Sequence, residues 1–125
     1  MAASDKPLVE PHEGAAPADL VIEDLVVGDG DVADTGRQAI VHYVGVSASS
    51  GEEFDSSWDR GDTFSFALGA GTVIAGWDRG VVGMRVGGRR RLVIPPHLGY
   101  GDRGAGGVIA PGETLIFVVD LVALR

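Results

Sequence analysis

A glycine-rich segment at residues 73–84, VIAGWDRGVVGM, constrains the fold more than any other part of the chain. Val73, Trp77 and Val81 are spaced four residues apart, which places them on one face of an α-helix. The segment also holds three glycines, and each glycine in a helix interior costs roughly 1 kcal/mol relative to alanine. A short helix of this composition is stable only when its apolar face packs on another element. We therefore expect one short helix that rests on a sheet, with Trp77 at the contact.

The segments on either side of this helix have the pattern of strands. Apolar side chains at every second position are typical of a strand that is buried on one face. Five or six antiparallel strands and one helix predict an α+β domain, in which a curled sheet wraps around the helix. The expected strands cover residues 20–27, 39–46, 63–68, 89–95 and 114–125, with a further extended stretch at 54–57.

The chain length of 125 residues indicates one folded domain. Residues 1–18 contain three prolines and no hydrophobic period, so we expect a disordered tail there and a folded domain at 19–125. An interaction arm is the alternative interpretation of the tail. The sequence begins without a signal-peptide pattern, and no apolar run is long enough to span a bilayer. We expect a cytoplasmic protein that does not enter a membrane.

The formal charge of −8 lies in the first part of the chain. Residues 1–34 carry nine of the 18 acidic side chains against a single lysine, while nine arginines balance the remaining acids. Residues 35–125 therefore offer no broad basic face, which argues against nucleic acid as the ligand. The three consecutive arginines at 89–91 would alternate between the two faces of a strand, and we expect them at a solvated strand end beside acidic side chains.

The residue types exclude several kinds of chemistry. The chain has no cysteine, so disulfides and thiolate nucleophiles are excluded. His12, His42 and His97 show neither metal-ligand spacing nor a catalytic serine motif, and His42 is expected to be a surface or packing residue. Residues 99–104 match the letters of a dinucleotide-binding loop, but no strand leads directly in and no helix leads out. We expect no metal and no cofactor.

Several motifs together resemble the FKBP-type peptidyl-prolyl cis-trans isomerases. They cover about residues 20–125, and their order along the chain is the order found in that family. The resemblance implies a half-barrel-like antiparallel sheet that crosses a short helix, with an apolar pocket between the two. The motifs are VHYVGV at 41–46, EFDSSWDRG at 53–61, FSFALG at 64–69, VIAGWDRGVVGM at 73–84, LGYG at 98–101 and PGETLIFVVDLVAL at 111–124.

The resemblance also implies which residues form the pocket. Family members bind a proline ring over the tryptophan, and many bind the macrolides tacrolimus and rapamycin in the same place. Proline-containing polypeptides and such macrolides are therefore the expected partners, and a monomer is the expected state. The sheet side of the pocket would be Tyr43, Phe54 and Asp55, its wall and floor Phe64, Val73, Ile74 and Trp77, and its closing residues Tyr100, Ile109 and Phe117. The catalytic set implied is Tyr43, Phe54, Asp55, Trp77, Tyr100 and Phe117.

Individual roles within this set have alternatives. Each aromatic residue could be plain core, because an aromatic on an apolar stripe usually is. The Asp55 carboxylate could polarise the substrate carbonyl, or it could pair with Tyr43 or Arg60. The second role is favoured, because a buried charge needs a partner. The resemblance implies that the Ile74 N–H and the Tyr100 hydroxyl hold the substrate by hydrogen bonds.

Other functions compete with an active isomerase. The 99–110 loop departs from the best-known eukaryotic members of the family, with Ala105, Val108 and Ala110 at positions where those members have other residues. Because this loop would cover the pocket, a proline-binding or chaperone module with little turnover is one alternative. A protein that recruits partners through its acidic residues 1–34 is another.

Overall fold

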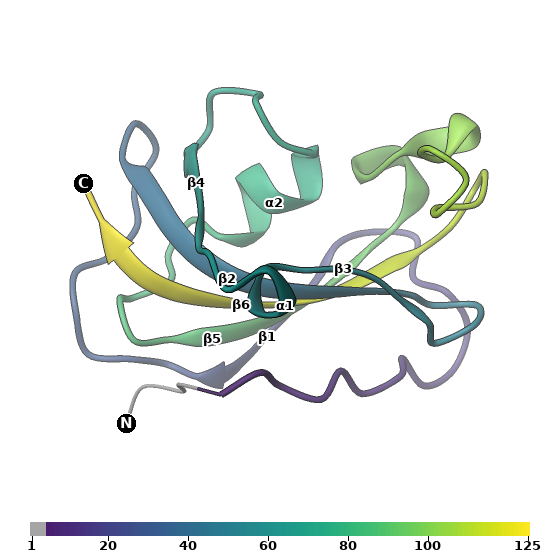
Figure 1. Ribbon diagram of the computed structural model, residues 1–125. Coiled ribbons are helices and arrows are strands. Elements are labelled where there is room, and N and C mark those ends of the chain that lie inside the picture. The colour runs from purple at the N-terminus through teal and green to yellow at the C-terminus, as the bar shows by residue number, and fades with distance from the viewer. Residues whose placement is uncertain (1–4) are drawn as a thin grey trace.

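The computed structural model describes residues 5–125 and shows a six-stranded antiparallel sheet that curls around a short helix (Figure 1). The sheet order is β1-β5-β6-β2-β3, and β4 pairs with the other half of β2. This arrangement confirms the predicted fold class. The strands are β1 (Val21–Val26), β2 (Gln38–Ser47), β3 (Glu53–Ser56), β4 (Phe64–Ala67), β5 (Arg89–Ile94) and β6 (Leu115–Leu124).

The long strand β6 lies in the middle of the sheet, between β5 and β2. Its odd-numbered residues, such as Phe117 and Leu121, belong to the main core on the concave face. Its even-numbered residues Ile116 and Val118 are on the opposite face but are also only 1% exposed. Both faces of this strand are therefore covered. None of the helices within residues 5–125 is long and apolar enough to cross a membrane.

The helix α2 (Ala75–Gly80) occupies the concave side of the sheet (Figure 1). Two of its glycines face β5 at very short distances. A Cβ atom on Gly76 would lie 2.6 Å from Ile94 Cγ2, and one on Gly80 would lie 2.7 Å from Leu92 Cδ1. The glycines that weaken this helix in isolation therefore let it approach the sheet closely. Gly83, with φ of 90°, follows within three residues of the helix end, so the helix is shorter than the predicted segment.

The edge of the sheet beside β2 is interrupted by a helical turn, α1 (Ser57–Arg60), which the sequence did not predict. The Ser56 hydroxyl caps this turn by accepting the Asp59 N–H. The Ser57 hydroxyl accepts the Tyr43 N–H at 2.7 Å and lies 3.3 Å from the Tyr43 carbonyl oxygen. One serine side chain thus replaces the strand hydrogen bonds that β2 loses where α1 leaves the sheet.

The arginines of β5 alternate between faces as predicted, but the expectation that they are solvated is wrong. Arg90 is 8% exposed and donates to the carbonyl oxygens of Gly80 and Val82 and to the Asp24 carboxylate. Arg91 is 9% exposed on the opposite face. Their long side chains are buried because α2 covers one face and the N-terminal segment covers the other.

Residues 5–18 contain no helix or strand and run along the convex face of the sheet, on the side opposite α2 (Figure 1). Val9 packs there against Val46, Val93 and Ile116. The predicted disorder of residues 1–18 stays a prediction, and residues 1–4 lie outside the described part of the chain.

Candidate functional site

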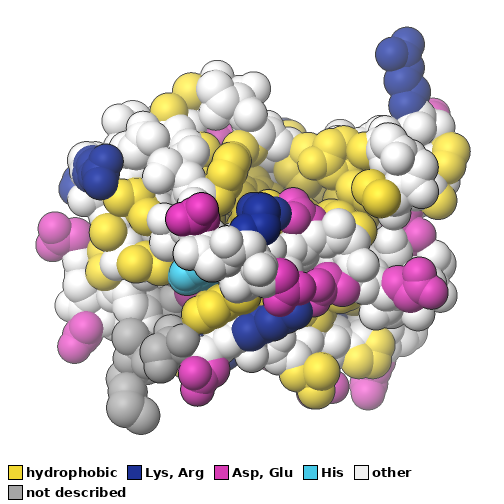
Figure 2. Space-filling model, viewed as in Figure 1, with side chains coloured by type: hydrophobic (Ala, Val, Ile, Leu, Met, Phe, Trp, Pro, Cys, Tyr) yellow, Lys and Arg dark blue, Asp and Glu magenta, His cyan; other side chains and the backbone are white. Residues whose placement is uncertain are grey.

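A cavity of about 430 Å³ opens between α2 and the concave face of the sheet. Figure 2 shows hydrophobic side chains gathered around a hollow on this side of the molecule. The volume lies in the range of small-molecule sites. Nine of the ten predicted pocket residues line the cavity, and Gly71 and Thr72 are additional. The lining consists of Tyr43, Phe54, Asp55, Phe64, Gly71, Thr72, Val73, Ile74, Trp77, Tyr100 and Phe117.

Ile109 is the predicted residue that does not line this cavity. It is 5% exposed, and it lines a neighbouring groove of about 740 Å³ together with Phe54. Its backbone bonds to Ala105 in both directions across a tight loop. Ile109 therefore belongs to the main hydrophobic core beside the cavity. The sequence pattern could not show whether Ile109 faces the cavity or the core, because the loop has no regular periodicity.

Trp77 stands at the centre of an aromatic cluster. Its indole is 4% exposed, and it extends from the first turn of α2 toward the sheet. Because several rings meet it near edge-to-face angles, the arrangement is one that aromatic quadrupoles favour. The ring centroids of Tyr43, Phe117, Phe66 and Phe64 lie at 4.9, 5.3, 5.5 and 5.8 Å from the indole.

The absence of a side chain at Gly45 allows two of the lining rings to meet. Gly45 faces the concave side of β2, and a Cβ there would lie 2.6 Å from the Phe117 ring and 2.7 Å from the Phe54 ring. Instead, Phe54 and Phe117 pack edge-to-face, with centroids 5.5 Å apart. The glycine in the VHYVGV motif is thus a requirement of the cavity wall.

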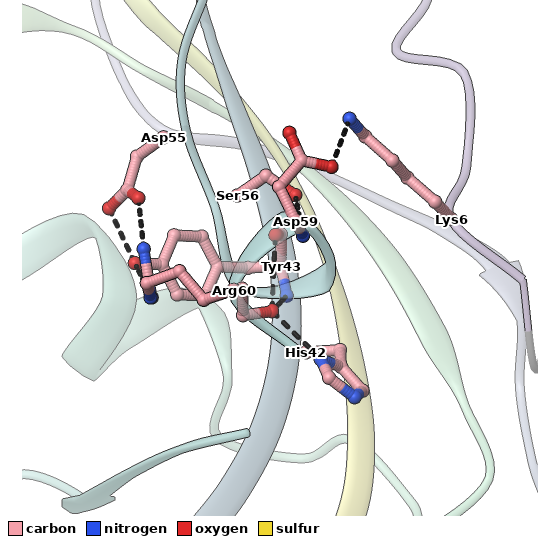
Figure 3. Close-up of polar contacts among 8 residues, drawn as sticks. Lys6, His42, Tyr43, Asp55, Ser56, Asp59 and Arg60 are labelled. Carbon is pink, nitrogen blue, oxygen red and sulfur yellow. Dashed lines mark hydrogen bonds and ion pairs between the residues drawn. The ribbon is translucent and has the colours of Figure 1, made fainter. Parts of the chain in front are cut away.

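One polar cluster lies at the rim of this aromatic cavity. The Tyr43 hydroxyl donates to Asp55 at 2.5 Å, and the Arg60 guanidinium donates to the same carboxylate and, at 3.0 Å, to the Tyr43 oxygen (Figure 3). Burial, followed by the hydrogen bond to Asp55, raises the pKa of Tyr43, and Arg60 partly opposes this rise. The geometry agrees with the interpretation in which Asp55 pairs with Tyr43 and Arg60 and shapes the wall.

Tyr100 stands at the mouth of the cavity, between two 3₁₀ turns, η1 (Pro96–Leu98) and η2 (Gly101–Arg103). It is 41% exposed. Its partial burial, with the negative charge of Asp55 as a second cause, raises its pKa. The Tyr100 hydroxyl is therefore a neutral donor over the whole physiological pH range.

The two unpredicted lining residues, Gly71 and Thr72, belong to the loop that leads into α2. The Asp78 carboxylate accepts hydrogen bonds from the N–H groups of Gly69 and Gly71, at 2.9 and 3.0 Å. This contact fastens the loop to the helix that carries Trp77. The sequence signal that could have predicted Gly71 and Thr72 as lining residues is the turn Gly69-Ala70-Gly71, because a tight turn brings its neighbours close to the start of the helix.

His42 packs outside the cavity, against residues of α1. The His42 ring stacks on Trp58 with centroids 4.2 Å apart and lies 2.9 Å from the Ser57 hydroxyl, and it does not line the cavity. It has the packing role that was expected. Within residues 5–125, no three histidine or acidic side chains gather as a metal site would require.

Comparisons with known proteins identify the family of the chain. The family model of FKBP-type peptidyl-prolyl cis-trans isomerases matches residues 30–122. An FK506-binding protein of Streptomyces anulatus is 64% identical over 121 residues, which cover 96% of this chain and 98% of that protein. A probable FK506-binding protein of Corynebacterium glutamicum is 52% identical over 119 residues, with 95% and 98% covered.

Solved structures give the same result. The crystal structure of AtFKBP13 superposes with a TM-score of 0.79 at 40% sequence identity, covering 88% of this chain and 96% of that chain. The fold and its relatives therefore define the class of protein as a prolyl isomerase. The chain belongs to the family of FKBP-type peptidyl-prolyl cis-trans isomerases.

Proposed function

We propose that the cavity between α2 and the sheet binds the proline of X-Pro segments and accelerates rotation about the preceding peptide bond. The observation that carries this proposal is the aromatic lining: six of the eleven lining residues have aromatic side chains, and the Trp77 indole is nearly fully buried among its neighbours. Macrolides of the tacrolimus and rapamycin type would compete for the same cavity.

The physical chemistry of the reaction suits such a lining. The barrier to peptide rotation is roughly 18–20 kcal/mol because the planar amide has partial double-bond character, and X-Pro bonds tolerate cis more readily than others. The planar amide is polar and well hydrated, whereas the twisted amide has lost its resonance. A cavity that removes water from the amide therefore disfavours the planar state relative to the twisted one. Each lowering of the activation free energy by about 1.4 kcal/mol raises the rate about tenfold.

Hydrogen bonds would hold the substrate chain in register. The Ile74 carbonyl accepts the N–H groups of Trp77 and Asp78, and the Ile74 N–H is not used in the hydrogen bonds of residues 5–125. It remains free for a substrate carbonyl at the cavity wall. The Tyr100 hydroxyl, half-exposed at the mouth, supplies a second donor.

A protease-coupled assay on short Leu-Pro and Phe-Pro peptides tests the proposal. We expect acceleration above the spontaneous rate at micromolar protein and its loss on adding rapamycin. Phe54→Ala should reduce kcat/KM about tenfold or more, because it removes one wall of the cavity. Val122→Ala, a truncation of a half-exposed side chain on β6, is the matched control and should leave turnover unchanged. Peptide binding without acceleration would favour a proline-binding or chaperone module instead.

A further inference from the structure

We propose that Lys6 is a positioning residue for the cavity, and that residues 5–10 form a strap that carries it across the convex face of the sheet. The inference rests on the proposed isomerase function. Through two ion pairs of Lys6, the N-terminal segment holds one wall of the cavity in place.

The ammonium group of Lys6 bridges two carboxylates. Lys6 Nζ lies 2.8 Å from Glu53 Oε1. It also lies 2.8 Å from Asp59 Oδ1, the contact drawn in Figure 3. The hydrogen bond to Asp59, followed by that to Glu53, raises the pKa of Lys6, and Lys6 in turn lowers the pKa of Asp59. Without the ammonium group, two negative side chains that now share one cation would repel each other.

These two carboxylates bracket the segment that forms the polar wall. Glu53 begins β3 and immediately precedes Phe54 and Asp55, and Asp59 lies in α1 immediately before Arg60. Lys6 therefore joins the two ends of the segment 53–60. Figure 3 shows Lys6 and Asp59 on one side of this segment and the Asp55, Tyr43 and Arg60 contacts on the other. A change in the spacing of the segment ends would alter the contacts that place Asp55.

The strap fixes Lys6 from both sides. Arg89 donates to the Asp5 carbonyl oxygen at 2.6 Å, and Arg91 donates to the Glu10 carbonyl oxygen at 2.8 Å. Between these anchors, Val9 packs against apolar side chains on the convex face. Holding the backbone on both sides reduces the entropy cost that a lysine ordinarily pays to form an ion pair. The pair is therefore more persistent than an exposed pair on a free tail.

A charge-removing variant of the full-length chain tests the role of Lys6. We expect Lys6→Gln to lower kcat/KM for a Leu-Pro peptide by roughly two- to fivefold at low salt, the range of a partly exposed ion pair. Lys6→Arg should restore the wild-type value. Arg125→Gln removes the same charge from an exposed C-terminal side chain and should leave activity unchanged. A thermal unfolding curve for each variant checks that the assay temperature lies well below the unfolding temperature of that variant.

Salt and a mutant cycle separate positioning from general stability. Raising the salt to about 1 M should narrow the difference in kcat/KM between wild type and Lys6→Gln, because exposed ion pairs are screened. Asp59→Asn combined with Lys6→Gln should give less than the sum of the two losses. In NMR spectra of Lys6→Gln, the Arg60 Nε–H resonance should move or broaden.

The role of Lys6 and the proposed isomerase function fail by different experimental results. Equal kcat/KM for wild type and Lys6→Gln at low salt, with normal acceleration in both, would overturn the role of Lys6 and leave the proposed function intact. An unchanged Arg60 resonance together with a lowered activity would also overturn it, since the effect would then not pass through the wall. A wild-type protein without any acceleration would contradict the proposed function itself.

Discussion

At the scale of single residues, Trp77 combines a structural role with the proposed binding role. Trp77→Ala removes a ring that four aromatic neighbours surround and should cost about 3–5 kcal/mol of unfolding free energy through the cavity it leaves. Urea denaturation followed by Trp58 fluorescence measures this. Phe54→Ala, at a half-buried position, should cost less. A loss below about 1 kcal/mol for Trp77→Ala would contradict the central place of the indole in the core.

The two tyrosines give a prediction about pH. The pKa of both Tyr43 and Tyr100 is raised above the ordinary value of 10.0. The native state then keeps each phenol proton to higher pH than the unfolded chain does. The stability linked to these protons is complete below pH 10 and is lost as the pH rises through the native pKa values.

Phenolate absorbance can follow this titration directly, because the chain has no third tyrosine. Asp55→Asn removes a charge that raises both pKa values, so both titrations should move to lower pH. Tyr43→Phe identifies which transition belongs to which residue. Titration of either tyrosine below its ordinary value in the native protein would be the contrary result.

At the scale of elements, α2 depends on glycines that its own helix propensity disfavours. Gly76→Ala should raise helix propensity by about 1 kcal/mol, yet its new Cβ would lie against Ile94, a stiff and fully buried side chain. Overpacking of this kind costs about 1–3 kcal/mol, so the net result should be a loss of stability. Arg79→Ala, at an exposed position of the same helix, should be nearly neutral. Urea midpoints compare the two, and a stabilised Gly76→Ala would show that α2 can move away from β5.

At the scale of the whole molecule, the N-terminal strap covers the convex face of the sheet. Deletion of residues 1–13 should cost about 1–3 kcal/mol, the range for exposing buried apolar side chains, because it uncovers Val46, Val93 and Ile116 and leaves Arg91 without the Glu10 carbonyl acceptor. Urea denaturation at low and high salt measures the loss. Most of it should persist at high salt, unlike the effect of Lys6→Gln. Equal stability of the two chains would mean that residues 1–13 do not pack in solution.

The sheet could be predicted because its signals are local. The alternation of β2, β4 and β6 sets which side chains face the helix, and strand bounds agree with the prediction to within one or two residues. The pocket was predicted through the family resemblance, and nine of its residues do meet in one cavity. That they bind substrate stays a prediction. The helical turn α1 was missed, because four residues are too few for a hydrophobic period.

The amino-acid sequence by itself determined the curled sheet, the single helix on it and the family, because side-chain periodicity and short motifs are properties of neighbouring residues. The tertiary structure alone decided which polar groups meet. Ser57 replaces strand hydrogen bonds of Tyr43, Arg90 reaches the end of α2, and Lys6 joins β3 to α1. These contacts link residues far apart in the chain. Their energies depend on burial and distance, which no local pattern encodes.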